Sequence, residues 1–342
     1  MPVALWMRRL AIAGVLLCFA VVVLGAYVRL TAAGLGCPDW PGCYGHLSPV
    51  GAAHSDTLPF PDRPLEVGKA WREMLHRYAV LTLSCLIGAL AVLAVHTRRQ
   101  RLVSVPLALA LVAALIVQAL LGMLTVTWRL NPLIVTAHLV FGMTTLALLW
   151  WLTLSLPTST WGTAAMGSAS HSISGGGGSP LASARRLVLL GLGALIVQIV
   201  LGGWTSSNYA AVACPDFPTC QGALWPHADF AQAFVLWHGQ INYEGGVLDN
   251  AARVAIHFTH RLGALLATTA LTIAAVFVLR RRGLVAARPR AGAVLAALGL
   301  QLLIGTSMVL KSFPLWLATA HTAGAALLLL ATLALLRVLS VR

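Results

Sequence analysis

Eight long apolar runs constrain this chain more than any other feature of its sequence. Each run approaches the roughly 20 apolar residues that a helix needs to cross a bilayer core of about 30 Å. Only helices and closed barrels satisfy their backbone groups in lipid, and the alternating pattern of barrel strands is absent. The sequence therefore predicts an all-α integral membrane protein with eight transmembrane helices. The predicted spans are Leu10–Val28, Met74–Val95, Val105–Val126, Leu133–Leu154, Arg185–Trp204, Val254–Val278, Gly292–Leu310 and Leu315–Leu336.

The few charges are mostly basic, and their positions predict an orientation. Charged residues make up only 9% of the chain, yet the formal net charge is +14. Arginines cluster at positions 8–9, 98–101, 185–186, 280–290 and 337–342, at chain ends and in short loops. By the positive-inside rule this side and both termini are cytoplasmic, and two long loops face outward. The same distribution argues against nucleic-acid binding. The first run lacks a small-residue cleavage site, so we interpret it as a helix rather than a signal peptide.

The two halves of the chain repeat each other. The clearest matches are His76-Arg77 with His260-Arg261, Gln118 with Gln301, and Thr136-Ala137-His138 with Thr319-Ala320-His321. Four spans per half predict a parallel repeat about an axis along the membrane normal, built as two four-helix bundles. We expect an N-terminal bundle at 1–156, a flexible Gly/Ser-rich cytoplasmic linker at 157–184 and a C-terminal bundle at 185–342. The matched glutamines, with Gly122 and Gly305, are interpreted as helix-packing residues.

Four histidines occupy equivalent places near the outer ends of the even-numbered spans. They are His76, His138, His260 and His321. A lone histidine at such a place is usually an interfacial polar residue, but four equivalent ones favour metal ligation. Imidazoles from two facing helices are a standard means of holding haem iron inside a bundle. Zinc fits less well, because a closed zinc site needs four ligands. Copper would favour added Met or Cys ligands, which do not cluster here.

One acidic residue breaks the symmetry between the halves. Glu73 lies three residues before His76, on the same helix face, where the second half has His257. Glu73 either pairs with Arg77 or orients a substrate and moves protons during oxidation. The half with the carboxylate is the better candidate for chemistry, and the other half suits a permanent electron-transfer haem. Arg77 and Arg261 are candidates for contacts with haem propionates, with lipid phosphate as the alternative.

Each outward loop carries the motif CPDxPxC. The cysteine pairs are Cys37 with Cys43 and Cys214 with Cys220. In an oxidising exterior such pairs form disulfides, and a structural staple is favoured over a redox role, which stays open. Cys18 and Cys85 lie inside spans and are predicted to pack as small apolar residues.

At these residues the chain resembles the haem A synthase family, in the bacterial type with two cysteine pairs. The resemblance implies an enzyme that oxidises the C8 methyl of haem O to the formyl of haem A by successive hydroxylations. It implies substrate haem between His76 and His138, Glu73 as the catalytic carboxylate, and a haem B cofactor between His260 and His321. The matching stretches are VRLTAAGLGCPDWPGC at 28–43, KAWREMLHRY at 69–78, TAHLVFG at 136–142, YEGGVLDNAARVAIHFTHRLGA at 243–264 and TAHTAGA at 319–325.

The resemblance also implies partners and a location. The partners are a haem O synthase and terminal oxidase assembly, in the bacterial inner (cytoplasmic) membrane and in contact with its lipid. The electron donor stays open, with quinol as one option, as does the source of the added oxygen. The main alternative is a non-catalytic di-haem b-type cytochrome, which would share the four histidines but has no need of Glu73. A haem exporter fits less well, because the chain lacks a Trp-rich outer segment. A parallel-repeat transporter fits less well, because breaks in the helices near the membrane midplane are lacking.

Overall fold

The computed structural model describes residues 2–55, 59–60, 63–100, 104–156 and 180–340. Within these ranges, eight helices are long and apolar enough to cross a membrane, which confirms the predicted all-α membrane fold with eight spans. They are α1 (Pro2–Leu30), α3 (Val67–His96), α4 (Val105–Thr127), α5 (Pro132–Ser155), α6 (Pro180–Ser207), α8 (Asn250–Arg280), α9 (Arg288–Leu310) and α10 (Leu315–Ser340).

Several helices extend beyond their apolar runs because polar residues and prolines start them. The side chain of Asn131 accepts the N–H of Leu133 at the start of α5, and Asp249 accepts the N–H of Ala252 at the start of α8. Helix α3 begins at Val67, about two turns before the apolar run predicted for this span. The stretch 71–78 therefore lies inside a regular helix rather than at its edge.

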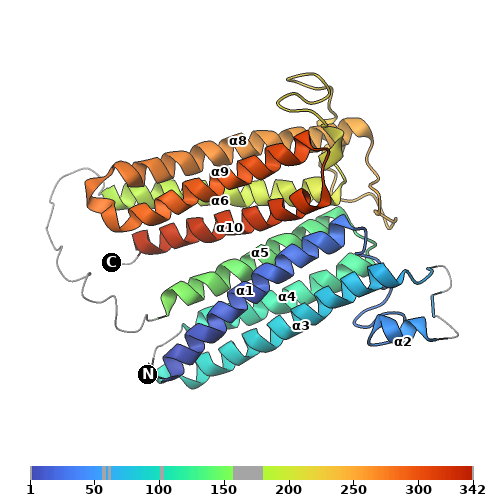
Figure 1. The fold of residues 1–342 in the computed structure, drawn as a ribbon, viewed down its shortest axis with the longest axis horizontal. Coiled ribbons are helices and arrows are strands. Elements are labelled where there is room, and N and C mark those ends of the chain that lie inside the picture. Colours follow the sequence, from blue (N-terminus) through green and yellow to red (C-terminus); the bar gives the residue numbers. More distant parts are fainter. Residues whose placement is uncertain (1, 56–58, 61–62, 101–103, 157–179, 341–342) are drawn as a thin grey trace.

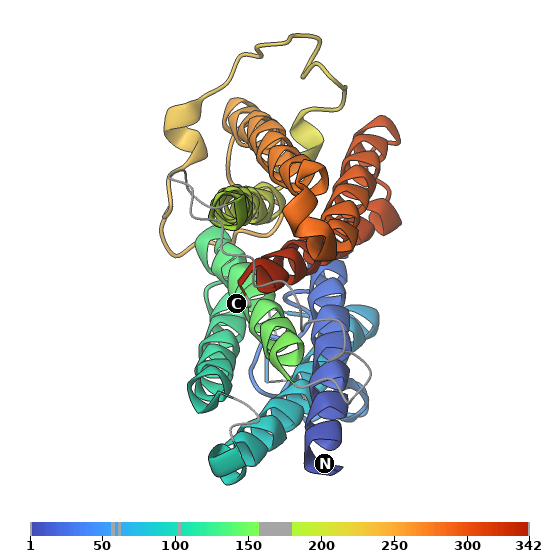
Figure 2. The ribbon, with the colours of Figure 1, turned by 90° about the vertical axis from the view of Figure 1, so that its left-hand side faces the viewer.

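The helices form two groups that follow the two halves of the chain (Figures 1 and 2). Helices α1, α3, α4 and α5 contact one another in ring order, and so do α6, α8, α9 and α10. Between the groups, α1 contacts α10, α5 contacts α6, and α5 contacts α10. Under the proposed repeat α1 corresponds to α6 and α5 to α10. The contact between α1 and α10 is therefore equivalent to the contact between α6 and α5.

An apolar core joins the two groups of helices. Its largest cluster draws buried residues from all eight spans, including Leu83, Leu146, Leu271 and Leu335. Polar contacts also cross between the groups. The Trp150 indole donates to the carbonyl of Leu330 at 2.9 Å, the Arg29 guanidinium donates to the carbonyl of Ser206 at 2.7 Å, and the Tyr243 N–H donates to the carbonyl of Arg129 at 3.0 Å. Together these contacts hold the two halves against each other.

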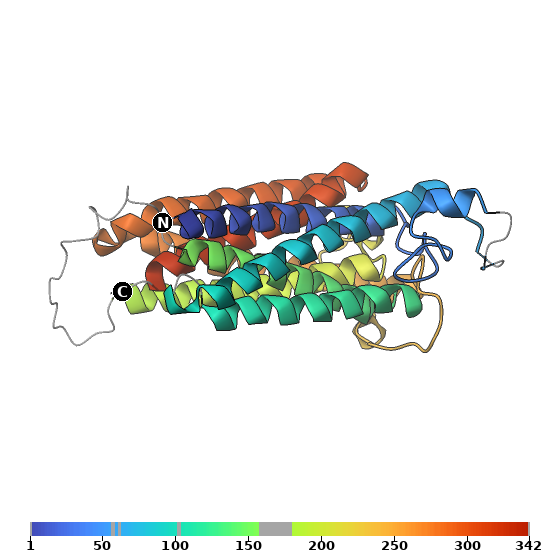
Figure 3. The same ribbon diagram turned by 90° about the horizontal axis from the view of Figure 1, so that it is seen from below.

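The long loops gather at one end of the helices, as Figures 1 and 3 show. One loop contains the short helix α2 (Pro49–Ala53), and the other contains α7 (Phe230–Ala233). Helix α1 begins and α10 ends at the opposite end of the molecule. Most of the predicted linker, 157–179, lies outside the described residues. Its last residues, from Pro180, begin α6, since a proline is tolerated in a first helical turn whose N–H groups lack helical partners.

Candidate functional site

The structure brings the predicted histidines of each half close together. The ring centroids of His260 (α8) and His321 (α10) lie 6.5 Å apart. His76 (α3) and His138 (α5) form the corresponding pair in the first half. In the ring order of each group, α3 stands opposite α5 and α8 opposite α10. Each histidine pair therefore faces across the interior of its own group of helices.

The spacing and the free nitrogens of these rings fit a metal atom held between two imidazoles. A metal–imidazole bond is about 2 Å long, so two ligands on opposite sides of one metal have ring centroids about 6 Å apart. The separation of His260 and His321 is close to this value. The buried Nδ1 atoms of His76, His138 and His321 have no hydrogen-bond partner. In the described residues no group of three or more His, Cys, Asp or Glu side chains is arranged to hold a metal ion, so the arrangement fits a two-ligand haem iron better than zinc.

Four glycines of the odd-numbered spans pack against these four rings. A Cβ added to Gly25, Gly122, Gly202 or Gly305 would lie 3.0, 3.3, 3.2 or 2.9 Å from Cε1 of His76, His138, His260 or His321, respectively. The absence of a side chain at each glycine therefore gives its histidine ring room. The sequence interpretation assigned Gly122 and Gly305 to helix packing and did not single out Gly25 and Gly202. The sequence does contain a signal for these two glycines, because Gly25 and Gly202 are separated by the same number of residues as the two cysteine motifs.

Placing a methyl group against one ring tests this arrangement. We expect Gly305→Ala to displace His321 and lower the haem content of the purified protein, because the added Cβ would stand 2.9 Å from the ring. Gly299→Ala on the same helix is the matched control, since a Cβ there meets nothing within 4 Å. Pyridine haemochrome absorbance per protein measures the difference. Equal haem content in the two variants would contradict the assignment of His321 as a haem ligand that needs the space left by Gly305.

Three glutamines link the odd-numbered spans to the histidine-bearing helices. The Nε2 atoms of Gln118, Gln198 and Gln301 donate to the carbonyls of His138, His260 and His321 at 3.0, 3.0 and 3.1 Å. Gln118 and Gln301 thus tie helices together, in keeping with the packing role assigned to them. Gln198 was not singled out from the sequence, although it stands four residues before Gly202 just as Gln301 stands before Gly305.

Glu73 lies one turn from His76 and is held by both its own helix and the first cysteine loop. Its side chain is buried, with the residue 5% exposed. One carboxylate oxygen pairs with the guanidinium of Arg77, and the other accepts the N–H of Cys37 at 2.8 Å. Arg77 also donates to the carbonyls of Asp39, Pro41 and Gly42. The predicted ion pair is therefore present, and the loop fixes its position beside the histidine.

Arg261 repeats this arrangement in the second half without a carboxylate. It donates to the carbonyls of Cys214, Asp216 and Thr219 at 3.1, 2.8 and 2.7 Å. Its Nε donates to His257 Nε2 at 3.3 Å, so His257 takes the place that Glu73 has in the first half. Both arginines predicted for propionate contacts are thus engaged with loop carbonyls.

Both predicted disulfides are present and close small loops. Cys37–Cys43 and Cys214–Cys220 each join Cα atoms 4.7 Å apart. The first disulfide loop touches Glu73 through the Cys37 N–H, a contact that the sequence could not reveal. Of the two remaining cysteines, Cys18 packs in the core as predicted, whereas Cys85 is exposed on α3.

Asp216 organises the second disulfide loop through its ionised form. Hydrogen bonds from the Thr219 hydroxyl, the Gly222 N–H and the Gln221 N–H lower the pKa of Asp216 from 3.8 to about 2. Because the folded pKa is depressed, the contribution of Asp216 is complete above about pH 4 and is lost as the pH falls toward 2. We expect the amide hydrogens of Gln221 and Gly222 to stay protected from exchange to about pH 3. Asp216→Asn should weaken that protection at neutral pH, and unchanged protection would contradict the role of the carboxylate.

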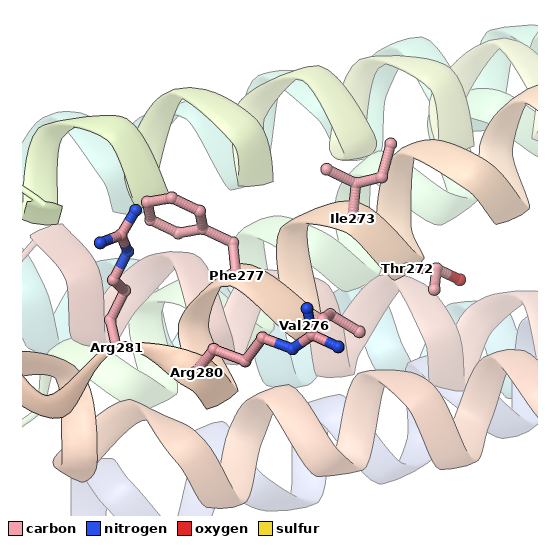
Figure 4. A pocket seen from close by; sticks show the side chains of 6 residues that line it. All are labelled: Thr272, Ile273, Val276, Phe277, Arg280 and Arg281. Carbon is pink, nitrogen blue, oxygen red and sulfur yellow. The ribbon is translucent and has the colours of Figure 1, made fainter.

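A hollow near the far end of α8 is separate from the histidines. It is lined by Thr272, Ile273, Val276, Phe277, Arg280 and Arg281 (Figure 4). His260 stands twelve residues before Thr272 on the same helix, or about 18 Å at 1.5 Å per residue. The hollow therefore plays no part in the candidate site.

Comparison with known proteins gives matches along nearly the whole chain. Residues 8–333 match the family model COX15-CtaA, described as cytochrome oxidase assembly protein. A heme A synthase of Shewanella oneidensis is 39% identical over 95% of this chain and 93% of its own length. Heme A synthases of Caulobacter vibrioides and Nitrosospira multiformis are 28% and 29% identical, over 96% and 97% of this chain and 93% and 92% of their own lengths.

Proposed function

The chain belongs to the COX15-CtaA family of cytochrome oxidase assembly proteins, and from this premise we propose that it is a haem A synthase. It is a membrane oxidoreductase that acts in the conversion of haem O to haem A. The observation that most favours this function is a difference in residues between two otherwise similar sites. Each half has a facing histidine pair, but among the described residues only the first half has a buried carboxylate one turn from a histidine.

In this proposal His76 and His138 hold the substrate haem, and His260 and His321 hold a haem B cofactor. The unpaired Nδ1 atoms, the 6.5 Å ring separation in the second half and the four glycines support this assignment. When bound, the haem iron supplies the electron-transfer and oxidising chemistry. The chain's own residues bind and orient the macrocycles and handle the protons.

Glu73 is the residue that we assign to proton handling. Hydroxylation of a methyl group and loss of water from the hydrated aldehyde both require protons to be moved at the reacting carbon and its oxygens, and a carboxylate beside the substrate is a suitable group to accept and donate them. Arg77 and the Cys37 N–H hold the two oxygens of Glu73, which fixes the carboxylate relative to His76. Arg77 is therefore a positioning residue. In the second half His257 and Arg261 form a similar contact without an acid, which suits a cofactor site with no substrate chemistry.

The proposal extends to the setting of the enzyme. The N-terminal half, 1–156, is the catalytic unit, and the C-terminal half, 185–342, would hold the haem B that supplies electron transfer when bound. The helix ends remote from the cysteine loops face the cytoplasm, and the cysteine loops face the outer side of the bacterial inner membrane. A haem O synthase supplies the substrate, and terminal oxidase assembly receives the product. The loop contacts of the cysteines support a structural role for both disulfides.

Haem analysis of the purified protein tests the proposed function. The protein is produced in cells that also make haem O, and its haems are extracted and identified by mass. We expect haem B together with haem A or a hydroxylated intermediate. Haem B alone, with no haem O or haem A under any condition, would overturn the synthase and favour a di-haem electron-transfer cytochrome.

A further inference from the structure

One odd-numbered span departs from a pattern that the other three share. In α4, α6 and α9 a glutamine stands four residues, or about one turn, before the glycine that touches a histidine ring. Helix α1 has the glycine, but Val21 stands where the glutamine is expected. The four pairs are Gln118 and Gly122, Gln198 and Gly202, Gln301 and Gly305, and Val21 and Gly25.

Two of the glutamines do more than join helices, because their amides lie beside histidine rings. Gln198 Nε2 is 3.1 Å from His260 Nδ1, and Gln301 Nε2 is 3.4 Å from His321 Nε2. Both ligand candidates of the second half therefore have an amide next to the ring as well as on the backbone carbonyl. In the first half Gln118 bonds the carbonyl of His138.

His76 differs from the other three histidines. Its neighbour on α1 at the corresponding place is Val21, an apolar side chain that is 8% exposed. The Nδ1 atom of His76 is buried without a hydrogen-bond partner, as are those of His138 and His321, so the difference lies in the side chain on the neighbouring odd-numbered span. A valine offers no hydrogen bond, so nothing on α1 replaces the amide that the other histidines have.

The amide oxygens are available for a bond that forms only when the rings hold a metal. The Oε1 atoms of Gln118, Gln198 and Gln301 are buried and have no partner. A histidine that binds a metal through one ring nitrogen nearly always donates the N–H of the other. The amide nitrogen is the atom that lies beside the ring, so the amide would turn about its terminal bond to offer its oxygen to that N–H. Loss of such a partner typically lowers metal affinity by about 10- to 100-fold.

We propose that these glutamines are positioning residues that set how tightly each histidine holds haem iron. Gln198 and Gln301 support both ligands in the C-terminal half, where the haem must stay. Gln118 supports one ligand in the N-terminal half, and Val21 leaves His76 unsupported. His76 is then the weaker ligand, on whose side substrate enters and product leaves. This inference rests on the proposed function, because it distinguishes a permanent cofactor from an exchanging substrate.

Exchanging the two residues tests the proposal. Gln198→Val gives the cofactor site the residue of the substrate site, and Val21→Gln does the reverse. Haem release from detergent-solubilised protein to excess apomyoglobin is followed by absorbance, and the haem type is identified by mass. We expect haem B to leave Gln198→Val about 10- to 100-fold faster than wild type, and haem O or haem A to leave Val21→Gln more slowly by a similar factor.

A second readout and matched controls separate this role from a structural one. Loss of an N–H acceptor makes the ligand less basic, so the haem B midpoint potential should rise in Gln198→Val. Gln198→Met keeps a side chain of similar length and should behave as Gln198→Val does. Val23→Gln is the control for Val21→Gln, because two residues along a helix place it about 200° around the axis. It should leave release rates unchanged.

The outcomes distinguish this inference from the proposed function. If His260→Ala and His321→Ala retain all the haem of the wild type, haem B is not held there and the proposed function fails. If those variants lose haem B, but Gln198→Val and Gln198→Met keep the wild-type release rate and potential, only the role of the glutamines fails. If Val21→Gln does not fold, the release rates and midpoint potentials of the two Gln198 variants decide whether the glutamines have this role.

Discussion

Replacing Glu73 by alanine should lower the conversion of haem O to haem A by about 100-fold or more while leaving haem B bound. A general acid–base group typically contributes about 10²- to 10⁴-fold to a rate. Glu73 is the one acid beside a candidate ligand pair in the described helices, and the second half has His257 at its place. Haem B content should be unchanged, because Glu73 belongs to the other half.

Two further variants make this prediction specific. Glu73→Gln keeps an acceptor for the Cys37 N–H but removes the charge and the proton-accepting group. It should be about as inactive as Glu73→Ala. His257→Ala changes the equivalent place in the second half and should reduce conversion by less than about tenfold. Conversion is measured as haem A formed per bound haem B. A Glu73→Gln enzyme with wild-type conversion would remove the carboxylate from the mechanism.

Replacing Arg77 by alanine should have the largest effect on stability of any single change near the site. It would leave the buried Glu73 carboxylate without its ion-pair partner and free three loop carbonyls at once. Breaking a buried ion pair on one side typically costs about 3–5 kcal/mol. We expect a clearly lower unfolding temperature in detergent, together with loss of haem O conversion.

A second ion pair, at the start of the same helix, provides the control. Lys69 and Glu66 are 2.8 Å apart, with side chains 30% and 60% exposed. Exposed pairs contribute less than about 1 kcal/mol, so Lys69→Ala should leave the unfolding temperature nearly unchanged. Arg77→Ala combined with Glu73→Gln should recover part of the lost stability, because no unpaired charge then remains buried. Equal unfolding temperatures for Arg77→Ala and Lys69→Ala would show that the Glu73–Arg77 pair does not stabilise the fold.

The sequence predicts the spans well because membrane insertion leaves a strong local signal. A run such as Val105–Val126 is apolar at nearly every position, and the helix observed there, Val105–Thr127, differs by one residue. The sequence predicts too late a start for α3, because the charged residues Lys69, Arg72 and Glu73 interrupt the apolar pattern there. They continue the helix outside the apolar run, where the first disulfide loop packs against it.

The sequence predicts only part of the candidate site, because only part of it follows from the repeat. The histidine pairs follow from the repeat, since equivalent residues on equivalent helices occupy equivalent places. The contact between Cys37 and Glu73 depends on how an irregular loop folds back, and no periodicity encodes that. The carbonyls that bind Arg77 and Arg261 belong to backbone and leave no mark in the side-chain sequence.

The most direct test of the central claim is a haem inventory of His138→Ala and His321→Ala, purified side by side from cells that make haem O. We expect His138→Ala to keep haem B but to contain neither haem O nor haem A. We expect His321→Ala to lose haem B. Loss of haem B from His138→Ala, with its retention in His321→Ala, would contradict the division of the molecule into a substrate half and a cofactor half.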